Sequence, residues 1–102
     1  DVGYTSYTAL LTQSGVVAPV ATVMQDSIGG TMTWSYNSVG SYTLTSSTSA
    51  FTAKTVVFVN GGSSATASGG VTWSVDTPAT LVIIAGADGR FTAGSLEVRV
   101  YS

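Results

Sequence analysis

The carboxylates of this chain are its first candidates for catalytic chemistry. They are Asp1, Asp26, Asp76, Asp88 and Glu97. Hydrolysis of a glycosidic bond by two carboxylates requires a pair about 5–10 Å apart across a cleft. Asp26, Asp76 and Asp88 lie instead close to Gly, Ser or Pro, where aspartate commonly caps a turn. The sequence therefore predicts no catalytic residue, and we expect the protein not to be an enzyme.

Histidine and cysteine are both absent from the chain. Their absence excludes a Ser-His-Asp triad, a cysteine nucleophile and disulfides, and it removes the main ligands of zinc and copper. The remaining metal hypothesis is calcium held by Asp76, Asp88 and loop carbonyls. The chain has no D-x-D-x-D-G pattern to support it. We expect no metal and no cofactor.

Aromatic side chains are the second group that could bind a ligand, because planar rings can stack on sugars. In strands, however, aromatic residues more often pack in a core or at an interface. We expect both tryptophans to lie in the core and leave a carbohydrate-binding platform open as the alternative. The candidate core or interface aromatics are Tyr4, Tyr7, Trp34, Trp73 and Tyr101.

The two tryptophans lie in equivalent places of an internal sequence repeat. Thr33-Trp34-Ser35 recurs as Thr72-Trp73-Ser74, so residue numbers differ by 39, and Phe51-Thr52-Ala53 recurs as Phe91-Thr92-Ala93, where they differ by 40. An alternating run follows each Phe-Thr-Ala, which aligns Thr55 with Ser95. Repeats reveal the building unit of a fold. We interpret residues 31–59 and 70–100 as related halves of a single domain, 1–102, joined by a Gly/Ser-rich loop at 61–70.

The elements that position these residues are expected to be β-strands. Thr, Val, Ile and aromatic residues alternate between Gly- and Ser-rich turns, and no useful length shows helical periodicity. The pattern predicts an all-β fold, a single small β-sandwich of jelly-roll or Ig-like type. The run at 81–85 is apolar on both faces, which indicates a central strand covered on both sides. The expected strands are 4–12, 20–25, 31–36, 41–46, 54–60, 71–76, 80–85 and 95–101.

Charge is unusually scarce: 8% of residues are charged, against about a quarter in ordinary domains. Three cations, Lys54, Arg90 and Arg99, cannot form a phosphate-binding face, so we exclude nucleic acid as a partner. No apolar run reaches the 18 or so residues of a membrane span. A neutral surface rich in hydroxyls repels its own copies only weakly, which favours self-association.

The opening and ending runs of the chain resemble a set of short proteins. The opening is Tyr7-Thr8-Ala9-Leu10-Leu11-Thr12-Gln13-Ser14-Gly15, and the ending is Leu96-Glu97-Val98-Arg99-Val100-Tyr101. They are similar to uncharacterised β-rich proteins of Bacteroidetes genomes, phages and viral metagenomes. The loop at 61–70 departs from that resemblance in being richer in Gly and Ser.

The resemblance implies a virion-structural context and no particular activity. We therefore expect a structural, self-assembling subunit of a virion surface or appendage, or of an extracellular filament. Its expected partners are copies of itself, with other virion proteins or surface glycans as further partners, and its expected location is the virion or the cell surface. A non-catalytic carbohydrate-binding module is the alternative function.

Overall fold

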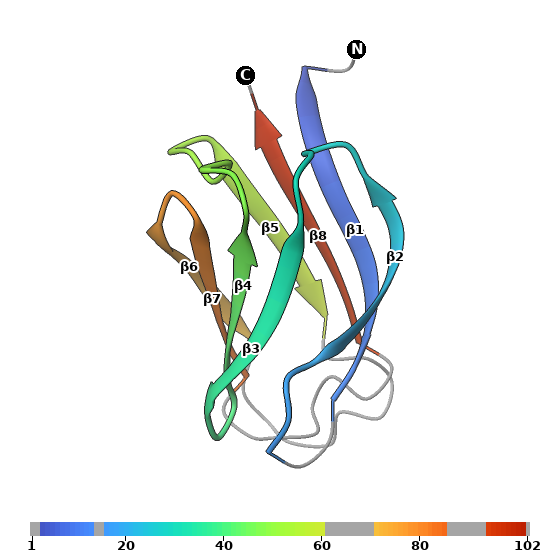
Figure 1. Ribbon diagram of the computed structural model, residues 1–102, viewed down its shortest axis with the longest axis vertical. Coiled ribbons are helices and arrows are strands. Elements are labelled where there is room, and N and C mark those ends of the chain that lie inside the picture. The colour runs from blue at the N-terminus through green and yellow to red at the C-terminus, as the bar shows by residue number, and fades with distance from the viewer. Residues whose placement is uncertain (1–2, 14–15, 61–70, 86–93, 102) are drawn as a thin grey trace.

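The computed structural model describes residues 3–13, 16–60, 71–85 and 94–101, and all regular structure in them is β-strand (Figure 1). The strand bounds agree with the expected ones to within two residues. The strands are β1 (Tyr4–Thr12), β2 (Val20–Asp26), β3 (Met32–Ser38), β4 (Ser41–Ser46), β5 (Thr55–Asn60), β6 (Thr72–Thr77), β7 (Thr80–Ile84) and β8 (Gly94–Tyr101).

The strands form two antiparallel sheets of four, which pack as the two layers of a sandwich (Figure 1). Sheet A has the order β2-β1-β8-β5, and sheet B has the order β3-β4-β7-β6. The all-β sandwich expected from the sequence is confirmed. Each sheet is built around long-range pairs, β1 with β8 in sheet A and β4 with β7 in sheet B.

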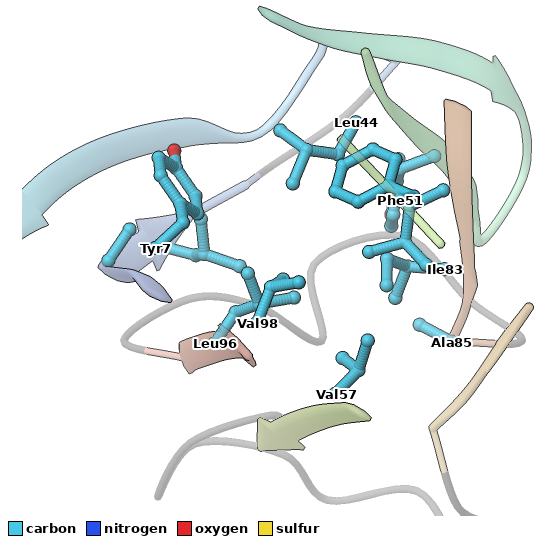
Figure 2. Close-up of a cluster of buried hydrophobic side chains, with 12 residues drawn as sticks. Tyr7, Leu44, Phe51, Val57, Ile83, Ala85, Leu96 and Val98 are labelled. Atoms are coloured by element: carbon cyan, nitrogen blue, oxygen red, sulfur yellow. The ribbon is translucent and has the colours of Figure 1, made fainter. Parts of the chain in front are cut away.

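The core lies between the sheets, because side chains alternate between the two faces of each strand. Burying each large apolar side chain there contributes about 1.5–3 kcal/mol. On β7, Leu81 and Ile83 are buried, whereas Ile84 on the other face is 41% exposed. Within the described part of the chain β7 is thus covered on one face only, and the expected second covering layer is not found there. The core consists of Tyr7, Ala9, Leu11, Tyr42, Leu44, Phe51, Val57, Leu81, Ile83, Ala85, Leu96 and Val98 (Figure 2).

The β3–β4 and β6–β7 hairpins have the same register. Trp34 lies opposite Leu44, and Trp73 lies opposite Ile83, so both partners are shifted by the same 39 residue numbers. Each hairpin also has a register shift at the same place, at Asn37 in the first and at Asp76 in the second. The repeated sequence of the hairpins therefore corresponds to repeated backbone structure.

The third strands of the two halves, β5 and β8, do not follow the expected alignment. An offset of 40 pairs Val56 with Leu96, but Val56 is 38% exposed and Leu96 is buried. Because facing alternates along a strand, only an odd offset matches the inner faces of β5 and β8. The second Phe-Thr-Ala motif, at 91–93, lies outside the described residues.

The turn of the first hairpin lies at Val39 and Gly40. Asn37 and Ser38, residue types that are common in tight turns, belong instead to β3. Gly40 has a φ of 69°, a conformation that glycine adopts without steric cost. The side-chain amide of Asn37 donates a hydrogen bond to Thr43 Oγ1 (2.6 Å), which holds the bulge against β4.

Candidate functional site

Tyr7 and Trp34 link the two sheets inside the sandwich. Trp34 Nε1 on β3 donates a hydrogen bond to Tyr7 Oη on β1 (3.3 Å). Tyr7 is 1% exposed and lies in the core (Figure 2). Trp34 is partly buried and packs against that core. Burial raises the pKa of Tyr7, the bond from Trp34 opposes that rise, and the negative charge of Asp26 adds to it. Tyr7 therefore belongs to the core, and Trp34 packs against it with part of its surface exposed.

Trp73 does not share the burial of Trp34, contrary to the expectation that both lie in the core. Its position opposite Ile83 places it on the inner face of sheet B, yet it is 37% exposed. The physical reason is sheet order: β6 is an edge strand of sheet B, and it contacts β5, one of the two edge strands of sheet A. No described strand lies beyond β5 to cover Trp73 as β1 covers Trp34.

A hollow of about 320 Å³ opens beside the indole of Trp73, and we call it the Trp73 hollow. Thr55 borders it, and the Thr55 hydroxyl is buried without a hydrogen-bond partner in the described part of the chain. The hollow therefore combines apolar surface with a carboxylate and hydroxyls, which suits an apolar side chain or a sugar ring. Its lining includes Phe51, Thr55, Trp73, Val75, Asp76 and Pro78.

In the described part of the chain no strand pairs with the side of β5 that faces away from β8, and we call this side the β5 edge. The backbone N–H of Tyr101 donates to the carbonyl of Lys54 (3.1 Å). Because backbone groups of an antiparallel strand point alternately to either side, those of Thr55, Val57 and Val59 point away from β8. Of these, the Thr55 N–H already donates to the Thr52 carbonyl (3.2 Å). Among the described residues, β8 is the only strand that pairs with β5.

The β5 edge differs from the other three sheet edges. Register shifts interrupt β2 opposite Thr8 and Ala9, β3 at Asn37 and β6 at Asp76. In contrast, β5 pairs with β8 without interruption from Thr55 to Asn60, and those six residues include no charge, Pro or Gly. Bulges, charges and prolines are the usual guards against edge-to-edge pairing. The β5 edge has none of them within its strand.

The outer face of sheet A has a cluster of aromatic residues around one arginine, which we call the Arg99 patch. It consists of Tyr4, Phe58, Glu97, Arg99 and Tyr101. The guanidinium carbon of Arg99 lies 4.8 Å from the ring centroid of Tyr4 and 4.9 Å from that of Phe58. Arg99 Nε donates to Glu97 Oε2 (2.7 Å), and the Tyr4 and Tyr101 ring centroids are 5.0 Å apart.

The Arg99 patch contains a residue that the sequence did not single out. Within the patch, Glu97 and Arg99 pair with each other along β8. The bond to Glu97, and then that to Tyr101, raises the pKa of Arg99. Phe58 is 50% exposed and was missed. The outward position of Phe58 in an alternating strand was the available signal.

Metal and membrane sites were also sought in the described ranges. No group of three or more acidic side chains gathers there to hold a metal ion. Asp88, half of the calcium hypothesis, lies outside the described residues. No helix in the described part of the chain is long and apolar enough to cross a membrane.

Comparison of the chain with protein-family models, with curated proteins and with solved structures found no match.

Proposed function

We propose that the protein is a non-enzymatic, self-assembling structural subunit. The observation that carries this proposal is the β5 edge. An uninterrupted, uncharged edge strand presents backbone N–H and C=O groups that a further strand can pair with, and nothing in its sequence discourages such pairing. The setting that we propose, a virion surface or appendage or an extracellular filament, comes from the sequence-based resemblance to uncharacterised β-rich proteins of Bacteroidetes genomes, phages and viral metagenomes.

The Arg99 patch supports the same proposal from an adjoining surface. Phe58 belongs both to β5 and to this patch, so a copy that adds a strand at the β5 edge also reaches the exposed Phe58 ring. Tyrosine and arginine are enriched among residues that dominate binding energy at protein interfaces. The ion pair and ring contacts already hold Arg99 in one conformation, which reduces the entropy lost when a partner binds.

A charged guard placed on the β5 edge tests the proposal. Val56→Glu adds a negative charge opposite Arg99, so the isolated fold should be retained, while neighbouring copies gain like charges at their contact. The matched control is Val23→Glu on β2, a 51% exposed valine on an interrupted edge. Circular dichroism establishes that both variants are folded.

We expect the unmodified protein to sediment above its 10.3 kDa monomer mass at micromolar concentration. Because like charges brought together at an interface are costly, Val56→Glu should weaken association about tenfold or more. Val23→Glu should not weaken it. A clean monomer at every concentration, with no rings or filaments by electron microscopy, contradicts the proposed function.

A non-catalytic carbohydrate-binding module is the second candidate, favoured by the exposed Trp73 beside Asp76 in the Trp73 hollow. Aromatic faces with nearby hydrogen-bonding groups suit neutral sugars. A glycan-array signal lost in Trp73→Ala, while sedimentation of the variant stays unchanged, supports this candidate. No signal from the unmodified protein removes it.

A further inference from the structure

The repeat relates the two halves of the sandwich by a pseudo-two-fold axis. The hairpins β3–β4 and β6–β7 share a register, β4 pairs with β7 at the centre of sheet B, and β5 pairs with β8 in sheet A. Exchange of the two halves therefore exchanges β5 with β8. It also moves β1, which lies beside β8, onto the β5 edge. Among the described residues, that equivalent position has no strand.

The surroundings of the two tryptophans differ because only one of them has a β1 strand nearby. Tyr7 covers Trp34 and accepts its indole N–H. Tyr7 belongs to β1, the strand beside β8 in sheet A. Trp73 has the Trp73 hollow at the corresponding place, and its indole N–H has no hydrogen-bond partner in the described part of the chain. A strand added at the β5 edge would occupy the position of β1 and place new surface against Trp73.

The charge of β5 indicates which strand fits there. Thr55–Asn60 is neutral, so a charged partner strand finds no counter-charge, while a second β5 meets no repulsion. A two-fold axis makes two β5 strands antiparallel. Centring them on Val57 pairs five of the six residues, with Val56 opposite Phe58 and Thr55 opposite Val59, and it sets the residues whose backbone groups point to the β5 edge against one another. The two Lys54 residues then lie at opposite ends, about 20 Å apart at 3.3 Å per residue.

We propose that two copies of the chain pair β5 with β5 about a two-fold axis at Val57, so that their A sheets become one continuous sheet of eight strands. This inference rests on the proposed self-assembly and names its contact. Because β6 contacts β5, the two Trp73 side chains approach one another over the paired β5 strands. Each hollow thereby gains an apolar cover, as β1 provides for Trp34.

Cysteine cross-linking tests the register, since the chain contains no cysteine of its own. Val56→Cys and a mass-tagged Phe58→Cys are mixed in equal amounts and oxidised. Both side chains point outward and are exposed, so the fold should be retained. Opposed residues of antiparallel strands lie 4.5–5.5 Å apart, within the range of a disulfide. We expect cross-linked mixed dimers to exceed the two homodimers combined about tenfold. Random collision would give as much mixed dimer as the two homodimers combined.

The controls separate the inference from the proposed function. Cross-linking of Phe58→Cys to Val23→Cys in preference to Val56→Cys indicates β5-to-β2 pairing, which overturns the two-fold contact and leaves self-assembly intact. If sedimentation shows assembly but cross-linking shows no preference for the 56–58 pair, the two-fold contact is likewise overturned and self-assembly stands. A protein that stays monomeric overturns both.

Tryptophan fluorescence gives a second measurement that introduces no cysteine. Trp34→Phe leaves Trp73 as the only tryptophan of the chain. We expect the emission of Trp73 to shift to shorter wavelength as the concentration rises through the association midpoint, because its ring leaves water. An unchanged emission maximum in a sample that sedimentation shows to be associated overturns the proposed cover over Trp73.

Discussion

Tyr7 is the residue whose chemistry most directly reports the integrity of the sandwich. Its ring is buried in sheet A, and its hydroxyl accepts the indole N–H of Trp34 from sheet B. Burial is the main cause that raises the pKa of this phenol above 10.0. The folded state therefore holds the Tyr7 proton more tightly than the unfolded state does.

This linkage predicts alkaline unfolding. Below pH 10 Tyr7 keeps its proton in both the folded and the unfolded state, and the contribution of Tyr7 to stability is complete. Above pH 10 Tyr7 ionises first in the unfolded state, so the free energy of unfolding falls as the pH rises toward the pKa of Tyr7 in the folded state. In Tyr7→Phe we expect a loss of about 0.5–1.5 kcal/mol at neutral pH and a weaker dependence on pH above 10.

Urea unfolding at a series of pH values measures both effects, with Tyr101→Phe as the exposed control. The control should keep the slope of the unmodified protein, because Tyr7 is still present. Equal slopes above pH 10 for the unmodified protein and for Tyr7→Phe contradict the role given to the buried phenol.

Trp34 and Trp73 show how much the sequence predicts at a single residue. Their shared motif and alternation place both side chains on the inner face of sheet B, as the structure has them. Their different exposure could not be predicted, because it depends on whether a strand far away in sequence lies across from them. Tyr7 of β1 meets Trp34, and the described chain has no second β1 for Trp73.

At the scale of elements, the strands were predictable and their neighbours were not. Alternating apolar residues and turn chemistry locate each strand from local sequence, and the repeat correctly matched the two hairpins. Which strands lie at sheet edges depends on long-range pairing, such as β1 with β8. The Arg99 patch has the same origin, since it brings together residues of β1, β5 and β8.

Amide hydrogen exchange should resolve the two sides of β5. In dilute protein we expect slow exchange at Val56 and Phe58, whose N–H groups point toward β8, and fast exchange at Val57 and Val59, whose N–H groups point to the β5 edge. Raising the concentration should slow exchange at Val57 and Val59 selectively. Nuclear magnetic resonance of the same sample at two concentrations gives the comparison.

The alternation is the decisive part of that result. Uniform slowing along β5 indicates a partner that packs over the outer face of sheet A and does not extend the sheet. Slowing confined to β2 moves the contact to the opposite edge. Either pattern contradicts strand addition at the β5 edge.

At the scale of the whole molecule, the scarcity of charge decides which forces can hold copies together. The net charge is −2 with three cations in 102 residues, so long-range attraction between copies is weak. Specific protein interfaces bury at least about 1,000 Å², which five paired residues of β5 alone are too few to supply. Apolar contact at Trp73 and at the exposed Phe58 must provide much of the remaining area.

An assembly held by backbone hydrogen bonds and apolar contact should be insensitive to salt. We expect the association constant to change by less than about threefold between 0.1 and 1 M NaCl, because screening over a Debye length of about 3–10 Å affects only charge pairs. Sodium sulfate should strengthen association, since it favours the burial of apolar surface. Sedimentation equilibrium across both salt series is the measurement. A loss of association of tenfold or more in NaCl would mean that Lys54, Arg99 or the carboxylates hold the copies together, and the neutral β5 edge could then not be the main contact.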